Sequence, residues 1–192
     1  MSDLEGVDDR ALMARHVAGD PDAFGEIFRR HRDRLWAVAV RTTGDRELAS
    51  DCVQDGFVNA FRRAGSYRGD AAVSTWLHRI VVNACLDRLR RERDVLRRAG
   101  DVADIDIVDD HDRHDQAETE LDVRAALAHL PEHQRLALVL VDMHGMPVAD
   151  AADVLGVAVG TIKSRCARGR EALAAVLGGR TDPAAREPQE RP

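Results

Sequence analysis

The chain has 192 residues, of which 44% are apolar and only 4% aromatic, and its formal net charge is −6. This length suits one large domain or two small ones, and the composition is typical of helical proteins that dissolve in water. The longest uncharged apolar runs, residues 35–40 and 136–141, are far shorter than the roughly 18 residues that a membrane-spanning helix needs. We therefore expect no membrane insertion.

The N-terminal residues and the cysteines indicate where the protein works. Residues 1–6 are acidic and lack the basic-then-apolar order of a signal peptide. Cys52, Cys85 and Cys166 are odd in number and far apart, which argues against a disulfide framework and against a zinc site. We predict a cytoplasmic protein with no metal and no other cofactor, whose cysteines pack between helices. A redox switch formed by Cys52 and Cys85 is the less favoured alternative.

The negative charge is concentrated in one segment. Residues 101–122 carry ten acidic residues against the single Arg113, a local balance of −9, so the rest of the chain sums to +3. Such a segment has too little apolar surface to fold by itself and is typical of a linker. The sequence therefore predicts a first domain at 1–98, an acidic linker at 99–120, a second domain at 121–178 and a disordered tail at 179–192.

The first domain begins with two helix patterns. A short amphipathic helix is predicted from Asp8 to Ala18, with Val17 among its inward residues. Asp20 and Pro21 then form a start signal, an N-cap followed by proline at the first helical position. The apolar face of this next helix repeats at a spacing of three and four residues. It includes Phe24, Ile27, Phe28, His31, Leu35, Val38 and Ala39.

Two more helices complete the predicted first domain. Gly44 ends the preceding helix and Asp45 caps the next, which leaves polar residues outside and an apolar stripe inside. A further helix is predicted from about Ala72, after a loop marked by Gly65 and Gly69, and its far end is strongly basic. The stripe of the helix that Asp45 caps contains Leu48, Ala49, Cys52, Val53, Phe57, Ala60 and Phe61.

Residues 148–170 predict two short helices joined by a tight turn. Ala152 is small where the second helix must cross the first, Gly156 allows the turn, and Ile162 packs back between the helices. The second helix carries four cations in eight residues and no acid, as expected of a helix that lies against DNA. These cations are Lys163, Arg165, Arg168 and Arg170. A solvated basic face on an ordinary helical hairpin is the alternative.

Two helices are predicted ahead of this helix-turn-helix. One contains Leu121, Ala125, Leu127 and Leu130, and the other begins at Pro131 and continues to Met143. No segment of the chain alternates apolar and polar residues with a period of two, so we expect no sheet. The predicted fold class is therefore all-α, with two small helical domains and a helix-turn-helix in the second.

Four sequence blocks together resemble one bacterial family. They are Gly-Asp-Pro-Asp-Ala-Phe (19–24), Ser-Asp-Cys-Val-Gln-Asp-Gly-Phe (50–57), the segment 67–83 that begins Tyr-Arg-Gly-Asp, and Leu-Pro-Glu-His-Gln-Arg (130–135). Their order and their distance from the helix-turn-helix resemble those of an extracytoplasmic-function (ECF) sigma factor of the sigma-70 family. This resemblance covers nearly the whole chain and implies domains two and four of such a factor.

The resemblance implies that the first domain binds core RNA polymerase and melted promoter DNA. Asp51, Gln54 and Asp55 match the helix that docks on the clamp of the large beta and beta-prime subunits, although three outward polar residues need no partner. The segment after Gly65 resembles the part that captures an unpaired base of the minus-10 element. The residues implied for minus-10 DNA are Tyr67, Arg68, Trp76, Arg79, Asn83, Arg88, Arg90 and Arg91. Trp76 is favoured as a core residue that shapes this site indirectly.

For the second domain, the resemblance implies that the helix-turn-helix reads the duplex minus-35 element in the major groove. The implied contacts are Thr161, Lys163, Ser164, Arg165, Arg168 and Arg170. Catalysis then belongs to the polymerase, so the chain itself is not expected to be an enzyme. The family also implies a silencing partner, an anti-sigma factor. A helix-turn-helix regulator that works without polymerase is the alternative function.

Overall fold

The computed structural model describes residues 4–99, 123 and 125–178, and every regular element among them is helical. The first domain contains α1 (Asp9–Val17), α2 (Ala23–Thr43), α3 (Arg46–Arg63), a short 3-10 turn η1 (Ala64–Ser66) and α4 (Val73–Ala99). The second contains α6 (Glu132–Leu138), a π-helical turn η2 (Val139–Met143), α7 (Val148–Leu155) and α8 (Val159–Gly178). The predicted tail and, apart from Ala99, the predicted linker lie outside the described residues.

Side-chain caps set several of the helix boundaries. The Asp45 carboxylate accepts a hydrogen bond from the Leu48 backbone nitrogen at 2.8 Å, and Gly44 ends α2 with a φ of 81°, so both predicted signals are confirmed. The start of α2 was predicted two residues too early. The Asp20 carboxylate accepts from the Asp22 nitrogen at 3.0 Å and thereby closes a turn ahead of Ala23.

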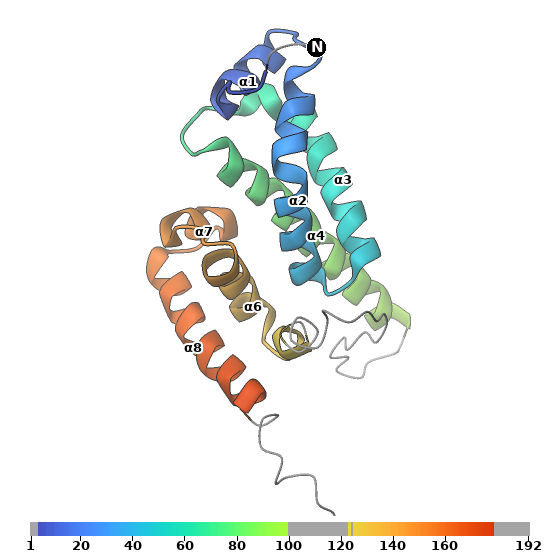
Figure 1. Ribbon diagram of the computed structural model, residues 1–192. Coiled ribbons are helices and arrows are strands. Elements are labelled where there is room, and N and C mark those ends of the chain that lie inside the picture. Colours follow the sequence, from blue (N-terminus) through green and yellow to red (C-terminus); the bar gives the residue numbers. More distant parts are fainter. Residues whose placement is uncertain (1–3, 100–122, 124, 179–192) are drawn as a thin grey trace, which may run out of the picture.

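Helices α2, α3 and α4 pack side by side, and α1 lies across one end of them (Figure 1). Their core consists of fully buried aliphatic side chains such as Ile27, Leu35, Leu77 and Val81. Such burial contributes on the order of 2 kcal/mol for each large side chain. The core therefore fixes the faces that α3 and α4 leave to solvent.

The apolar stripes of the first domain are narrower than predicted. Val17, Phe28 and Phe61 were expected inside, but they are 56%, 40% and 52% exposed. Phe28 and Phe61 touch the core with one face only: Phe28 packs on Phe57 with ring centroids 4.7 Å apart, and Phe61 packs on Phe24 at 5.2 Å. A helix stripe covers more than 100° of arc, so residues at its margin lie at the rim of the bundle.

The N-terminal segment is held on α2 by ionic and hydrogen-bonding contacts. The Arg30 guanidinium donates to the carbonyl oxygens of Leu4 and Val7 at 2.9 and 2.6 Å, and His31 contacts the Asp9 carboxylate at 2.6 Å. These contacts fix the position of α1 against α2. As a result, α1 also lies next to the loop before α4.

The helix-turn-helix has the predicted structure. Ala152 and Ile162 are buried, and Gly156 ends α7 with a left-handed φ of 64°. The single helix predicted from Pro131 to Met143 is instead divided after Leu138 by the π-helical turn η2, in which the His144 nitrogen donates to the Val139 oxygen at 3.1 Å. Residues 136–140 are all buried, so apolar periodicity could not reveal the change of helix type.

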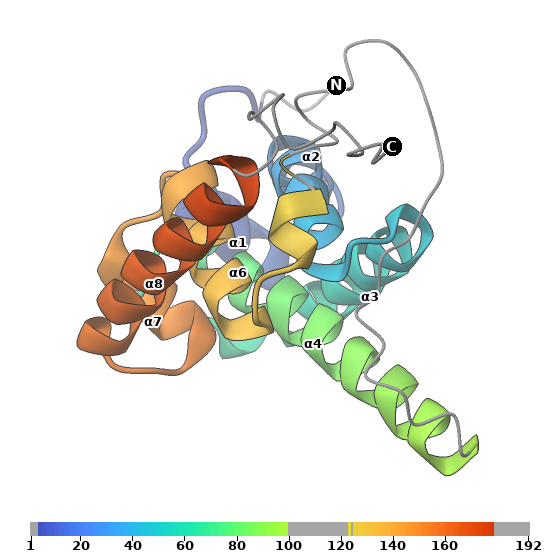
Figure 2. The same cartoon turned by 90° about the horizontal axis from the view of Figure 1, so that it is seen from below.

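The two domains pack against each other. Val38 of α2 and Val82 of α4 are fully buried in the same apolar cluster as Leu136 and Ile162 of the second domain. Figures 1 and 2 show α3 on one side of α4, and α7 with α8 on the other. Among the described residues, no helix has the length and apolarity that crossing a bilayer requires.

Candidate nucleic-acid interface

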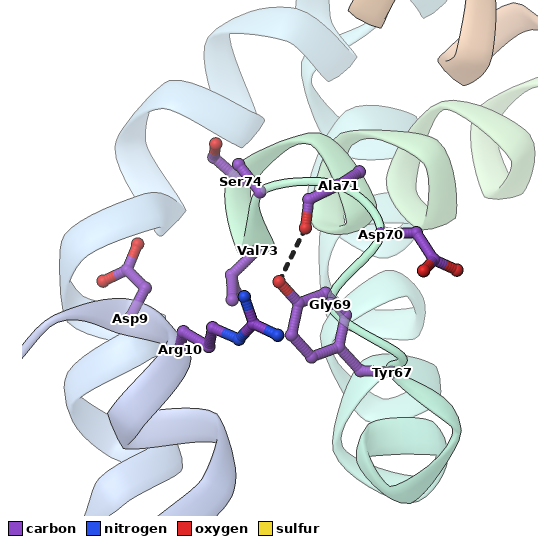
Figure 3. Close-up of a pocket in the computed structure, with 9 residues that line it drawn as sticks. Asp9, Arg10, Tyr67, Gly69, Asp70, Ala71, Val73 and Ser74 are labelled. Atoms are coloured by element: carbon purple, nitrogen blue, oxygen red, sulfur yellow. Dashed lines mark hydrogen bonds between the residues drawn. The ribbon is translucent and has the colours of Figure 1, made fainter.

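The loop between η1 and α4 surrounds a hollow of about 380 Å³ (Figure 3). Gly69 has a φ of 79°, which lets the loop reverse. The Tyr67 hydroxyl donates to the Ala71 carbonyl oxygen at 2.6 Å and holds the loop closed. Arg10 of α1 reaches across from the other side, and its guanidinium lies so close to Gly69 that a β-carbon there would be 2.5 Å from Nη2.

A second hollow, of about 210 Å³, adjoins the first. Tyr67 lines both, and its ring is 5.6 Å from that of Trp76. This second hollow gathers four of the residues predicted for minus-10 DNA: Tyr67, Arg68, Trp76 and Arg79. It thus combines aromatic faces with cations, which is the chemistry that binds unstacked bases and their phosphates.

The other predicted minus-10 residues follow along α4. Asn83 is exposed and lies one helical turn beyond Arg79. Arg88 and Arg90 are exposed farther along and have acidic neighbours, Glu92 at 3.7 Å and Asp87 at 3.2 Å. Arg91 is exposed as well. These arginines therefore lie along α4, apart from the hollow.

Sequence reasoning missed Arg10 and Thr75 at this site. Arg10 belongs to α1, far from the loop in the sequence, and only the fold brings it next to the loop. Thr75 directly follows the loop in α4, but it is buried and lines the second hollow.

The predicted polymerase-binding residues share one surface of α3. Asp51, Gln54 and Asp55 are exposed, and their spacing places them on adjacent turns. Cys52 and Cys85 lie behind them in the core and are 2% and 0% exposed. The neighbouring Cys52 thiol and burial raise the pKa of Cys85. All three cysteines are free and buried, as predicted.

The recognition helix α8 presents only part of its predicted set to solvent. Lys163 and Arg168 are exposed, whereas Thr161, Ser164 and Arg165 are half-buried. The Ser164 hydroxyl donates to the Thr161 carbonyl oxygen at 2.9 Å. Arg170 makes a two-pronged contact with Asp142, both nitrogen–oxygen distances being 2.8 Å, and this carboxylate raises the pKa of Arg170.

The described residues contain no group of histidine, cysteine and acidic side chains that could hold a metal ion.

Comparison with known proteins decides the family. Residues 27–95 match Sigma-70 region 2, and residues 120–173 match Sigma-70, region 4. The chain is 53% identical over 171 residues to the ECF RNA polymerase sigma factor SigM of Mycobacterium tuberculosis, covering 88% of this chain and 85% of that protein. The chain belongs to the ECF sigma factors. The RNA polymerase sigma-H factor of Pseudomonas aeruginosa is 34% identical, with 86% and 91% covered.

Solved structures of ECF sigma factors share this fold. The sigma factor RpoE of Bartonella quintana, in complex with the anti-sigma factor NepR, matches with a TM-score of 0.73 and 28% identity over 82% of this chain and 98% of that one. CnrH, in complex with the cytosolic domain of CnrY, matches with a TM-score of 0.66 and 31% identity over 89% and 97%. The all-α, two-domain fold class predicted from the sequence is therefore confirmed.

Proposed function

We propose that this ECF sigma factor directs core RNA polymerase to promoters by holding two DNA elements at once. The hollows around Tyr67 take an extruded base of the minus-10 non-template strand, and α8 reads the minus-35 duplex. The observation that carries this proposal is the grouping of Tyr67, Trp76 and Arg79 around one hollow in a chain that also contains a helix-turn-helix. Binding an extruded base offsets the few kcal/mol that unstacking costs.

The exposed acidic face of α3 is the proposed contact with the polymerase clamp. Asp51 and Asp55 are one helical turn apart and exposed, so they can pair with cations of a partner and fix its orientation. The polymerase forms the bonds of the RNA, and this chain supplies position and strand capture. We place the protein in the cytoplasm, where the polymerase works.

A protein partner that silences the chain is also proposed. The two similar structures hold RpoE with the anti-sigma factor NepR and CnrH with the cytosolic domain of CnrY. An anti-sigma factor for this chain would act by covering the surfaces of α3 and α4 that polymerase and DNA require.

Run-off transcription tests the proposal. Purified protein is added to sigma-free bacterial RNA polymerase on promoter fragments from its own source. We expect discrete new start sites that weaken strongly in Asn83→Ala and Arg165→Ala. Glu171→Ala, which changes another α8 residue outside the predicted contacts, serves as the matched control and should retain activity. Binding of duplex DNA without any gain of polymerase specificity would instead indicate a polymerase-independent regulator.

A further inference from the structure

Helix α7 of the second domain lies directly on the part of α4 that lines the minus-10 hollow. The Arg79 Nε donates to the Asp153 carbonyl oxygen at 3.0 Å, and the Thr75 hydroxyl contacts the Asp150 carboxylate at 3.3 Å. Asp153 and Val154 form part of the wall of that hollow. Arg79, a proposed DNA contact, therefore already binds protein.

The contact extends well beyond these two hydrogen bonds. Val38 and Val82 of the first domain are fully buried in the apolar cluster of the second. At the margin, Arg34 donates to the His144 carbonyl oxygen at 2.5 Å, and Arg93 forms an ion pair with Glu132. An apolar centre with a polar rim is the usual build of a specific protein interface.

Helix α7 places two acidic residues beside the hollow that is proposed to bind minus-10 DNA. Asp150 lies beside Thr75, and Asp153 borders the hollow formed by Trp76 and Arg79. A phosphate approaching Arg79 would come near these acidic residues, and the Nε donor is already taken by the Asp153 carbonyl oxygen. Like charges at such distances repel, and the occupied guanidinium offers fewer donors.

The recognition helix is not covered in the same way. Lys163 and Arg168 of α8 are exposed in this arrangement. The closed contact therefore obstructs one of the two proposed DNA sites and leaves the main cations of the other open to solvent.

We propose that the free chain closes on itself, with α7 of the second domain walling off the minus-10 hollow of the first, so that the domains must separate before single-stranded promoter DNA can enter. This inference rests on the proposed function, because it concerns the regulation of the same hollow. Binding of polymerase, or of any partner that separates the domains, would make the hollow accessible to DNA.

A reversible disulfide tests whether the closed arrangement exists in solution. Thr75→Cys and Asp150→Cys are introduced together, and the free protein is treated with oxidised glutathione, which takes up the two thiol hydrogens as it is reduced. The native cysteines are buried, and each single variant serves as a control. We expect rapid intramolecular disulfide formation only in the double variant. Absence of that bond in the folded free protein would overturn the proposal.

The locked protein is then tested for activity. With sigma-free polymerase, we expect the oxidised double variant to lose transcription at least about tenfold, since opening is blocked, and to recover it with reductant. A locked protein that transcribes as well as the reduced one would overturn the proposal. If even wild type and the reduced variant give no transcription, the proposed function fails, while disulfide formation still shows whether the domains close.

An opened variant gives the opposite test. Asp150→Ala with Arg34→Ala removes one contact on each side of the interface, the hydrogen bond with Thr75 and the one with the His144 carbonyl oxygen, and leaves the net charge unchanged. We expect it to bind a fluorescent single-stranded oligonucleotide carrying the mapped minus-10 sequence on the order of fivefold tighter than wild type, with unchanged binding of a minus-35 duplex. The matched control is Glu171→Ala with Arg32→Ala, which removes the same charges away from the interface. Equal oligonucleotide affinity in all three proteins would overturn the proposal.

Discussion

At the scale of single residues, Tyr67 links the loop to the site. Its hydroxyl donates to the Ala71 carbonyl oxygen, and its ring lines both hollows and packs near Trp76. The hydroxyl therefore shapes the loop, and the ring supplies the face on which a base can stack. These two roles can be separated by substitution.

We expect Tyr67→Phe to reduce promoter opening severalfold, because loss of one hydrogen bond loosens the loop by about 0.5–1.5 kcal/mol. Tyr67→Ala should reduce it far more, since it also removes the stacking face, which is worth about 1–3 kcal/mol. Permanganate reactivity of the melted strand measures both variants. Equal losses in the two variants would contradict a role for the ring in base capture.

The arginines of α8 also differ in their surroundings. Arg168 is exposed, whereas the Arg170 guanidinium is held by Asp142 at 2.8 Å. We expect Arg168→Ala to weaken binding of a minus-35 duplex by about 1–3 kcal/mol if it reads a base. Arg170→Ala should affect DNA binding less and lower the free energy of unfolding only slightly, as for an exposed ion pair. Titration of labelled duplex measures the DNA binding of both variants, and urea unfolding measures their stability. A larger loss of binding in Arg170→Ala than in Arg168→Ala would contradict this prediction.

At the scale of helices, the crossing of α3 and α4 depends on Gly56. A β-carbon at this position would lie 2.6 Å from Val81 Cγ2 and 3.3 Å from the Val81 α-carbon. The backbone contact means that rotation of the valine alone cannot make enough room. Because α3 carries the proposed polymerase surface and α4 the minus-10 site, this crossing sets the distance between the two.

Gly56→Ala is therefore expected to lower the free energy of unfolding by about 1–3 kcal/mol, the usual cost of overpacking. Gly25→Ala on α2 is the matched control: nothing lies within 4 Å of its β-carbon position, so the change should stabilise the protein by about 0.4–1 kcal/mol. Urea unfolding measures both. If both substitutions changed the free energy of unfolding in the same direction, helix propensity rather than the crossing of α3 and α4 would decide the outcome.

At the scale of the whole molecule, the contact between domains buries two histidines. His78 donates from Nδ1 to the Ser74 carbonyl oxygen at 2.7 Å, and Nε2 of both His78 and His144 is buried without a hydrogen-bond partner. Burial lowers the pKa of each, and for His144 to about 4. The nearby cations Arg34 and Arg41 act in the same direction on His144. Both imidazoles are therefore neutral in the closed state.

Acid should consequently weaken the closed state. When the domains separate, both histidines return toward a pKa near 6.5, so the open form binds more protons below that value. For His144 this difference extends down to about pH 4. The contribution of the neutral histidines to the stability of the closed state is complete above about pH 6.5 and is lost as the pH falls. We expect the radius of gyration from X-ray scattering to rise between about pH 7.5 and about pH 5, and the rise to shrink in His144→Gln. A radius that does not change with pH would contradict this linkage.

Most helix ends and the helix-turn-helix could be predicted from the sequence alone. Asp45 and Gly44 set helix ends through contacts within a few residues, and Ala152, Gly156 and Ile162 specify the helix-turn-helix, so short-range patterns were enough. The cations of α8 and the aromatic loop residues were likewise recognisable from their types and order. The predicted roles of the site residues themselves stay predictions.

Other features depend on how the helices pack. Phe28 and Phe61 were misassigned to the core because periodicity gives the direction of a side chain but not the width of the groove that receives it. The π-helical turn begins inside a run of buried residues, 136–140, where no pattern marks a change of period. The docking of α7 on α4 joins residues such as Thr75 and Asp150, 75 positions apart. Contacts of this range depend on the shape of whole domains, which no local spacing encodes.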